Sequence, residues 1–593
     1  MKIQLKRYYK VLFSLIFGII VFLFWDLFYP AFLSYQEQFQ MFLFDHSYWS
    51  ERISVPGGFA DYIGEFFTQF NFNVWMGAII LAILYVILQR VMWILAKKES
   101  AKDIFYPLSV IPILLLWNYM SDESVLLSFV VAITMAISTY FCYLYIKNKW
   151  IKIIYLAVMT PFLFWVAGSV NFIFVGMVII HEVAQTVHHT SNKKQISVVS
   201  IITLLILLLF YSIVIPILIY QFVPYPLHRL YSGINYYRIP DVPNLQYFVT
   251  FIFTITPFVL GKLPKVNHKK TLYIYIQILI LILGGYLYIS KAFSQNTEDM
   301  MEYDYLTRNA KWDDIIKKAD KASPMNPFGV TALNLALGMT NQLGDRMFNY
   351  YQNGTEGLLS NTNKDFISPL PVSEAYYRLG MINAAQRTSF EIMEAIPNYR
   401  KSGRLYKRLA ETNIINGEYA VAAKYLRILQ KTMFYKSWAD YAMTYLYNDK
   451  KVNEHPEWGR LRQLTYSEDF LFSDKEMDMM LGLLFKHNHT NRMAFEYLMA
   501  YELLNRDLKK FYEFFPIGQY ANFDHIPLSY QQALLFIWTQ NHKDFNGIPW
   551  SINLEIAQEI IAFARTFSNE GKNSPRLKTY LGTYWYYLLV ENS

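Results

Sequence analysis

Long apolar stretches dominate the first half of the chain, and shorter amphipathic stretches dominate the second half. A helix needs about 20 mostly apolar residues to cross the roughly 30 Å hydrocarbon core of a bilayer. The first half therefore predicts nine membrane-spanning helices, at about residues 10–29, 74–95, 104–119, 125–146, 151–167, 170–188, 196–220, 246–261 and 271–290. The third and eighth are short, and prolines lie within or near several spans, so neighbouring helices or water must satisfy the backbone carbonyls that proline frees.

The loops between these spans alternate in charge. If the amino terminus is cytoplasmic, the cytoplasmic segments carry seventeen Lys and Arg residues and the opposite segments carry three, namely Arg52, Arg229 and Arg238. Basic loops stay on the cytoplasmic side of a membrane. We therefore expect an inner (cytoplasmic) membrane protein with a cytoplasmic amino terminus and a periplasmic carboxy-terminal half.

The carboxy-terminal half has the pattern of helical repeats. "GEYAVAAKYLRILQ", from Gly417, and "KWDDIIKKADKASPMNP", from Lys311, place aromatic and small residues as tetratricopeptide (TPR) helices do. Trp312 and Tyr419 are 107 residues apart, close to three units of about 34 residues. The predicted fold class is all-α: a polytopic helical domain at residues 1–290, followed by a TPR-like α-solenoid at residues 291–593.

Composition excludes some classes of protein. The chain has 593 residues, of which 54% are hydrophobic, and its whole net charge of +8 comes from the first 290 residues. A neutral tail is not a nucleic-acid-binding domain, because such a domain needs a concentrated cationic face. The single cysteine, Cys142, lies in the fourth predicted span, so the tail forms no disulfides and offers no thiol chemistry.

The first external loop is acidic and rich in aromatic rings. Asp61 and Glu65 stand four residues apart in "GGFADYIGEFF", so a helix would place both carboxylates on one face. Two like charges at this spacing are unfavourable unless a cation, a basic partner or Arg52 compensates them. The rings suit a pair of short helices lying in the membrane interface, joined by a turn at residues 56–58.

A second external loop, residues 221–246, is basic and contains His228, Arg229 and Arg238. Carboxylates of the first loop would serve as general bases, and arginines of the second would hold a phosphate by paired hydrogen bonds. Interfacial anchoring with salt bridges between the loops is the alternative interpretation.

This arrangement resembles the GT-C glycosyltransferases, in which a long acidic first external loop and a long loop between spans seven and eight flank the active site. The resemblance implies a polyprenyl-phosphate sugar donor and a catalytic base in the first loop. Glu37, in "SYQEQFQMF", lies closest to the place of that base, and Asp26 is second. The paired acids usual in that family's loop are absent here. The whole chain also resembles an uncharacterised family of Bacteroidetes membrane proteins.

The sixth predicted span ends in "HEVAQTVHH". Gln185 stands where a HExxH zinc protease has its second histidine, so this motif is excluded. A buried Glu182 would cost about 2.5–3.5 kcal/mol deep in a membrane, which favours a polar cavity or the headgroup region. Structural packing, a proton relay and a metal site all remain open for this cluster.

Two functions follow as hypotheses. The first is transfer of a sugar from a polyprenyl-phosphate carrier to an extracytoplasmic acceptor, with no certain cofactor and a divalent cation as one candidate. Its site residues are Glu37, Asp26, Asp61 and Glu65 as acids, with Arg52, His228, Arg229 and Arg238 toward the phosphate. The second is a non-enzymatic scaffold, in which the bilayer anchors repeats that bind a protein or peptide partner.

Overall fold

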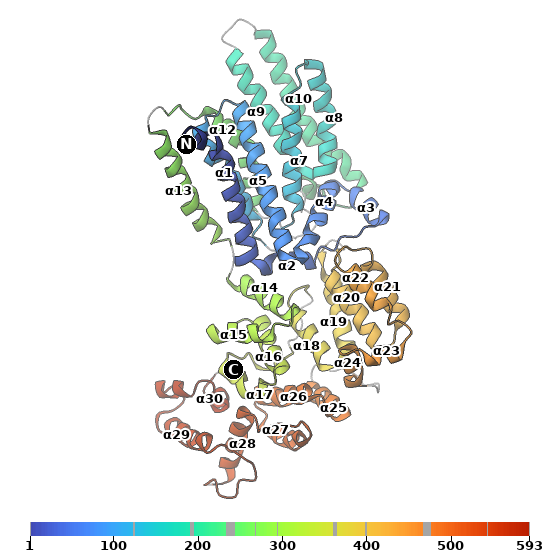
Figure 1. Ribbon diagram of the computed structural model, residues 1–593, viewed down its shortest axis with the longest axis vertical. Helices are drawn as coiled ribbons and strands as arrows, with labels where there is room; N and C mark the ends of the chain where they lie inside the picture. Colours follow the sequence, from blue (N-terminus) through green and yellow to red (C-terminus); the bar gives the residue numbers. More distant parts are fainter. Residues whose placement is uncertain are drawn as a thin grey trace. The chain divides into compact units, whose positions relative to one another are not determined.

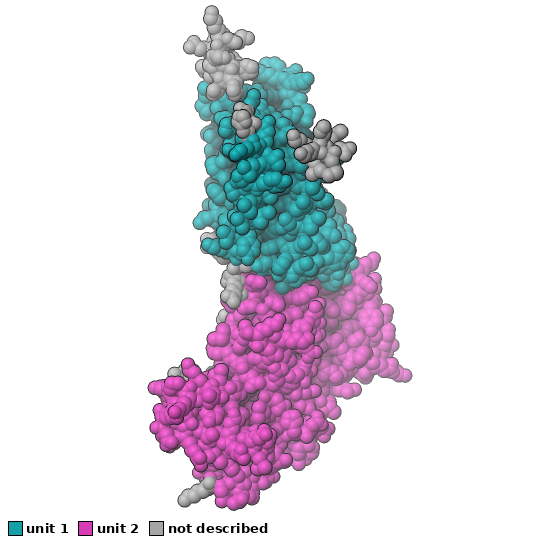
Figure 2. Space-filling view, turned by 60° about the vertical axis from the view of Figure 1, so that its left-hand side comes forward, with its two compact units in different colours: residues 1–295, 397–402, 431–434 teal, residues 296–396, 403–430, 435–593 magenta. Residues whose placement is uncertain are grey.

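The computed structural model describes residues 2–122, 125–189, 195–232, 244–266, 269–292, 295–359, 365–397, 400–466, 476–542 and 544–591. Over these residues the secondary structure is helical and contains no strand, which confirms the predicted all-α class (Figure 1). The chain forms two compact units. Unit 1 comprises residues 1–295 with two later segments, 397–402 and 431–434, and unit 2 comprises the remainder (Figure 2).

The helices of unit 1 lie both in the predicted apolar stretches and in the two long loops predicted between them. They are α1 (Lys2–Leu23), η1 (Phe24–Phe28), α2 (Pro30–Gln38), α3 (His46–Ile53), α4 (Gly58–Thr68), η2 (Gln69–Phe72), α5 (Val74–Lys98), η3 (Asp103–Val110), α6 (Ile111–Tyr119), α7 (Ser128–Tyr143), α8 (Lys149–Ala167), η4 (Gly168–Val170), α9 (Asn171–His189), α10 (Gln195–Ile219), η5 (Tyr220–Phe222), α11 (Leu227–Tyr231), α12 (Asn244–Lys262) and α13 (Lys270–Ile289).

Six helical segments among the described residues are long and apolar enough to cross a membrane. One of them, Lys149–Thr186, is 38 residues long and contains two of the predicted spans. These two are separated at Gly168, whose positive φ of 65° interrupts the helix. The apolar helices Asp103–Tyr119 and Ser128–Tyr143 are shorter than a full span. Unit 1 is therefore a polytopic membrane domain.

Buried polar side chains tie the first spans of unit 1 together. Ser14 of α1 donates a hydrogen bond to Gln89 of α5 at 2.7 Å, and the Gln89 amide donates to Ser109 of η3 at 2.6 Å. Because each buried polar atom in this chain of contacts has a partner, the desolvation cost of placing it in an apolar interior is offset. Gly18 allows α1 to approach α5, since a Cβ there would lie 3.0 Å from Val86.

Three short helices occupy the loop between α1 and α5, and glycines set their geometry. Gly57 begins α4 from the left-handed region, with φ of 80°. A Cβ on Gly58 would lie 1.7 Å from the carbonyl oxygen of Arg52, so only glycine fits where α3 turns into α4. Gly64 lets α4 pack directly on the backbone of Ser128 at the start of α7. These contacts fix which face of α4 is buried.

Unit 2 is built from short amphipathic helices. They are α14 (Gln295–Arg308), α15 (Trp312–Lys321), α16 (Pro327–Met339), α17 (Leu343–Arg346), η6 (Met347–Asn349), η7 (Gly354–Gly357), α18 (Leu370–Leu379), α19 (Ile382–Ala395), α20 (Gly403–Ile415), α21 (Tyr419–Leu429), α22 (Lys436–Met443), α23 (Asp449–Glu454), α24 (Trp458–Leu464), α25 (Met477–His487), α26 (Arg492–Leu504), α27 (Leu508–Phe514), η10 (Phe515–Tyr520), α28 (Leu528–Asn541), α29 (Leu554–Glu570), η11 (Pro575–Tyr580) and α30 (Tyr584–Leu589).

One turn geometry recurs between consecutive helices of unit 2. At Gly417 the chain has a φ of 79°, the Glu418 amide bonds the Asn413 carbonyl, and the Gly417 amide bonds the Ile414 carbonyl. This is the Schellman motif, which satisfies the last carbonyls of a helix. The same pair of bonds and a positive φ recur where Ala310, Asn341 and Gly380 end α14, α16 and α18. Each of these turns leads from one helix directly into the next.

The turns at Ala310, Asn341, Gly380 and Gly417 follow one another after 31, 39 and 37 residues. Ala422 and Leu426, within the stretch that begins at Gly417, are fully buried, and α21 packs against α20. Short helix hairpins of this kind cannot bury their apolar faces alone, so each depends on its neighbours.

Candidate functional site

The loop between α1 and α5 contains a buried cluster of ionisable side chains. Asp61 and Glu65 lie one turn apart on α4, and each is only 1% exposed. The Arg400 guanidinium lies between them, with Nη2 at 2.5 Å from Asp61 Oδ2 and Nη1 at 2.5 Å from Glu65 Oε1. Arg400 belongs to unit 1 through the segment 397–402. The like charges of α4 are thus bridged by one cation.

A second cation and a phenol complete the cluster. The Arg52 side chain, on α3, donates from Nε to Glu65 Oε2 at 3.0 Å, and the Tyr48 hydroxyl donates to the same oxygen. The guanidinium carbon of Arg52 lies 4.8 Å from the centre of the Tyr48 ring. Arg52 was one of the candidates expected to compensate the α4 carboxylates, and it contacts Glu65. Arg400 is the cation that contacts both carboxylates.

Formal charges in the cluster cancel, since two carboxylates face two guanidiniums. Burial opposes ionisation of Asp61, but the adjacent Arg400 and Arg52 outweigh it and hold the pKa of that carboxyl below its usual range. Burial and the neighbouring Glu65 raise the pKa of Tyr48 well above its ordinary value, so the phenol stays protonated and acts as a donor. Buried charges persist only when they are paired in this manner.

Two segments from the second half of the chain complete the loop region of unit 1. The Met41 amide bonds the Lys401 carbonyl at 3.0 Å, and the Phe44 amide bonds the Lys431 carbonyl at 2.8 Å. The Phe72 ring stacks on Phe434 with centroids 5.2 Å apart. The extended stretch between α2 and α3 therefore finds backbone partners in residues far along the chain.

Glu37 and Asp26, the acids that the family resemblance favours, lie outside this cluster. Glu37 is on α2 and is 4% exposed, between the buried amides Gln36 and Gln38. The Gln36 side chain donates to the Val125 carbonyl at 3.0 Å, which holds α2 against the start of α7. Asp26 lies in the π-helical turn η1 and is half-buried.

The predicted phosphate-binding residues of the second loop do not join the cluster around Asp61 and Glu65. His228 is exposed and Arg229 is half-buried on α11. This helix packs against α10 and η4, where Leu230 joins an apolar cluster with Phe164 and Ile215. Arg238 lies outside the described residues. Of the predicted site residues, the structure thus brings Arg52, Asp61 and Glu65 together.

Glu182 and His181 of α9 have polar partners on other helices. Glu182 accepts from Lys152 Nζ at 2.8 Å and from the Tyr143 hydroxyl at 2.7 Å. His181 Nδ1 lies 2.7 Å from Glu99 Oε1. These contacts account for a polar cluster in an apolar helix, since each charge has a counter-charge or donor. In the described part of the chain, no three acidic, His or Cys side chains form a metal-binding group.

Unit 2 has its own buried ion network between helices. Glu374 of α18 accepts from Arg378 Nε at 2.8 Å and from Arg408 of α20 at 2.5 Å. Burial disfavours the charged form of Glu374, but Arg408 and Arg378 outweigh it and lower its pKa to about 2. The Arg408 guanidinium also covers the Tyr377 ring at 3.4 Å. The network links α18 to α20 and has the character of a structural contact.

Another part of unit 2 buries two acids close together. Glu502 of α26 is 0% exposed, and Asp478 of α25 is 3% exposed. Lys510 of α27 pairs with Asp478 at 2.6 Å, which leaves Glu502 beside a carboxylate whose cation is already engaged. Burial, followed by the charge of Asp478, raises the pKa of Glu502 to about 8. Asp507 adds to this effect, and Lys510 opposes it.

Arg400 is the functional candidate that sequence reasoning missed. It stands 339 positions after Asp61, within "NYRKSGR". The only signal in the sequence is indirect: two acids on one face of an apolar helix require a cation. The sequence offers many arginines, and nothing in the local pattern of residues 398–404 distinguishes this one.

We expect Arg400→Leu to destabilise unit 1 strongly, by about 3–5 kcal/mol, because it leaves two carboxylates buried without their shared cation. The measurement is the unfolding midpoint of the full chain in detergent. Adding Asp61→Asn and Glu65→Gln to Arg400→Leu should restore much of the loss, because the uncompensated charges are then removed.

Arg387→Leu is the matched control, because Arg387 and Glu391 form an exposed pair at 2.9 Å. Its removal should change stability by no more than about 0.5 kcal/mol. An Arg400→Leu protein as stable as the wild type would show that the buried cluster contributes nothing to folding.

The raised pKa of Glu502 predicts that this carboxyl makes the folded state less stable as pH rises. An ordinary paired acid, whose pKa is lowered, has the opposite effect on stability. Its folded pKa of about 8 exceeds its unfolded value, so the folded state holds the proton more tightly. Stability should therefore fall as pH rises from about 4.5 to about 8. Glu502→Gln should flatten this fall and raise the midpoint of thermal unfolding at about pH 8 by roughly 2–4 °C.

The exposed acid Glu391, changed to Gln, serves as the control and should leave the pH profile unaltered. Identical profiles for the wild type and Glu502→Gln would contradict a protonated, buried Glu502.

A known protein family matches nearly the whole chain. A protein family described as of unknown function, DUF6057, matches residues 6–591. Neither a curated protein nor a solved structure matches the chain. The match spans both units, including the loop acids and Arg400. The chain therefore belongs to the DUF6057 family.

Proposed function

We propose that the protein is a non-enzymatic scaffold of the cell envelope. Its apolar helices hold it in the cytoplasmic membrane, and unit 2 forms a helical-repeat surface outside the cytoplasm that binds a partner protein. In this proposal the membrane domain anchors the protein, and the helical tail binds the partner.

One observation carries this proposal, namely the state of the acids on α4. Asp61 and Glu65 are 1% exposed and engaged by guanidinium groups. A general base must reach the proton that it removes and must change its protonation state during the reaction. Asp61, whose pKa is depressed by Arg400 and Arg52, is poorly suited to that role, and the Glu65 carboxylate is likewise held by arginines inside a packed interior. The same arrangement suits a structural role, in which the ion pairs hold α4 in place.

The architecture of unit 2 supports the second part of the proposal. Successive short helices that cannot bury their apolar faces alone stack into extended surfaces, and such surfaces commonly bind proteins or peptides. Large aromatic side chains remain exposed on unit 2, including Tyr441 at 47% and Tyr447 at 73%. Exposed tyrosines are frequent at protein interfaces because they bury much area at a small entropic cost.

Sugar transfer from a polyprenyl-phosphate carrier is the second candidate, and Glu37 is the observation that favours it. This buried carboxylate sits on a short helix of the first long loop, among the amides Gln36 and Gln38. In this alternative Glu37 is the base toward the acceptor hydroxyl, and Arg229 holds the phosphate.

Glu37→Gln separates the two functions. The full chain, as wild type and as the variant, is crosslinked in native membranes, and the partner is identified by mass spectrometry. Membranes are also tested for release of sugar from a lipid-phosphate carrier. The scaffold predicts the same crosslinked partner for both proteins and no sugar release attributable to either.

Glu51→Gln is the matched control, because Glu51 is an exposed acid of the same loop, with 65% of its side chain accessible. Sugar release that Glu37→Gln abolishes and Glu51→Gln retains would replace the scaffold with the transferase. Absence of any specific crosslink to unit 2 would also overturn the scaffold.

Sidedness is tested with single cysteines in a Cys142→Ser background. Lys450→Cys lies on α23 of unit 2, and Lys149→Cys begins α8; both positions are exposed. In right-side-out vesicles a membrane-impermeant maleimide should label Lys450→Cys and spare Lys149→Cys until the membrane is opened. The reverse pattern would place the tail in the cytoplasm and remove the envelope from the proposal.

A further inference from the structure

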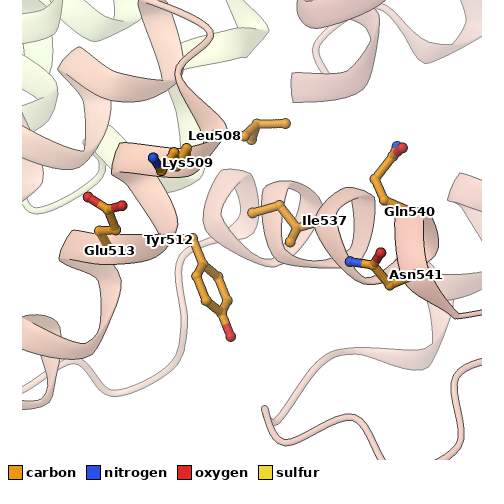
Figure 3. Close-up of a pocket in the computed structure, with 7 residues that line it drawn as sticks. All are labelled: Leu508, Lys509, Tyr512, Glu513, Ile537, Gln540 and Asn541. Atoms are coloured by element: carbon orange, nitrogen blue, oxygen red, sulfur yellow. The ribbon is translucent and has the colours of Figure 1, made fainter.

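The charged side chains beside the hollow between α27 and α28 of unit 2 are turned away from its far wall. The hollow has a volume of about 450 Å³, and its lining includes Ile537. Figure 3 shows the Lys509 and Glu513 side chains on the side of α27 opposite to Gln540 and Asn541 of α28. Nothing in the structure shows what covers this hollow. A group of exposed lysines in unit 1 differs from these charges, because the apolar helices that bear the lysines fix what they face.

Two membrane-spanning segments of unit 1 meet at a loop that is rich in lysine. α5 ends at Lys98 and α8 begins at Lys149, and both helices belong to segments long and apolar enough to cross a membrane. The Lys98 Nζ atom lies 4.3 Å from the centre of the Tyr145 ring, in the loop that joins α7 to α8. The end of one span and the start of another therefore lie together, at the depth where unit 1 meets the lipid headgroups.

The acids beside this loop already have partners. Each of the three has a cation or a histidine within 2.8 Å: Asp103 has Lys10, Glu99 has His181, and Glu182 has Lys152. Lys98, Lys147 and Lys149 are exposed, and among the described residues none of these three lysines has a carboxylate partner. Three positive charges are thus available to a partner outside the chain.

Two exposed aromatic rings lie next to these lysines in the sequence. Tyr145 is 57% exposed, and Trp150, in the first turn of α8, is 74% exposed. The Asn148 side chain accepts a hydrogen bond from the Trp150 amide at 2.9 Å, which caps α8 and fixes where the helix begins. Trp and Tyr rings settle at the membrane interface, because their apolar part faces hydrocarbon while their polar atom reaches water. The neighbouring lysines are therefore held near the depth of the lipid phosphates.

We propose that Lys98, Lys147 and Lys149 bind the headgroup of an acidic phospholipid. The lysine ammonium is a point charge with three hydrogen-bond donors, which suits the oxygens of a phosphate. A zwitterionic phospholipid carries the same phosphate together with a cation of its own, which the three lysines repel. The inference goes beyond the proposed scaffold function, because it concerns the lipid around unit 1 and is independent of what unit 2 binds.

The apolar surface beside the lysines favours a lipid over a free phosphate ion. Ile151, Ile154 and Val158 lie along one face of α8, and each is more than 50% exposed. The acyl chains of a lipid cover such a face, together with the Trp150 ring, while its headgroup meets the lysines. A phosphate ion would contact the lysines alone and would gain nothing from the apolar face.

The test uses the full chain in detergent with an equimolar mixture of phosphatidylglycerol and phosphatidylcholine of the same acyl length. Native mass spectrometry counts the lipids that stay bound. The wild type should retain phosphatidylglycerol in about tenfold excess or more. Lys149→Gln should lower this excess about fivefold, because each lysine near acidic headgroups contributes about that factor in affinity. The double variant Lys147→Gln/Lys149→Gln should remove most of the excess.

Lys270→Gln is the matched control, because Lys270 is likewise the exposed first residue of an apolar helix, α13, and its loss should leave the excess unchanged. Equal retention of the two lipids by the wild type would overturn the inference. Equal losses in Lys149→Gln and Lys270→Gln would also overturn it, since the attraction would then be spread over the surface. Displacement of bound phosphatidylglycerol by inorganic phosphate would make a free anion the occupant and would exclude the lipid.

Discussion

The pairing of Arg400 with Asp61 and Glu65 is the interaction on which the loop region of unit 1 depends. Two carboxylates on one face of α4 cannot remain ionised inside a packed interior without a cation, and the shared guanidinium supplies it at 2.5 Å from each. The cost of desolvating three charges is large, and it is offset only because their geometry is complementary. Removing one of the three side chains would leave a buried charge unpaired. The folded state would then be less stable than if all three charges were absent.

The same cluster explains why the loop between α1 and α5 is folded. The helices of this loop are too short to span a membrane. Gly58 and Gly64 let α4 approach Arg52 and Ser128 closely, so the acids are directed inward. The segment at Lys401 then supplies a backbone carbonyl to Met41 as well as the neighbouring guanidinium. Charge neutralisation and backbone satisfaction come from the same stretch of chain.

Much of the fold could be predicted from sequence because it follows from local pattern. Apolar runs predicted the long helices of unit 1, and amphipathic stretches predicted helices in unit 2. Gly380 and Gly417 were recognisable as helix ends, whereas Ala310 and Asn341 adopt the same positive φ without glycine and gave no signal. Arg400 could not be assigned to the site, because its contact with Asp61 joins residues 339 positions apart and no local periodicity records such a pairing.

The position of Arg400 along the chain has a consequence for biogenesis. Translation must continue for 111 residues beyond Ile289, the end of the last apolar helix, before this arginine is made. During that interval Arg52 is the one guanidinium of the cluster that has been made, and the cation shared by Asp61 and Glu65 is still missing. The buried cluster between α1 and α5 can therefore close only after all the apolar helices of unit 1 have been made, and a chain terminated before residue 400 would lack the shared cation.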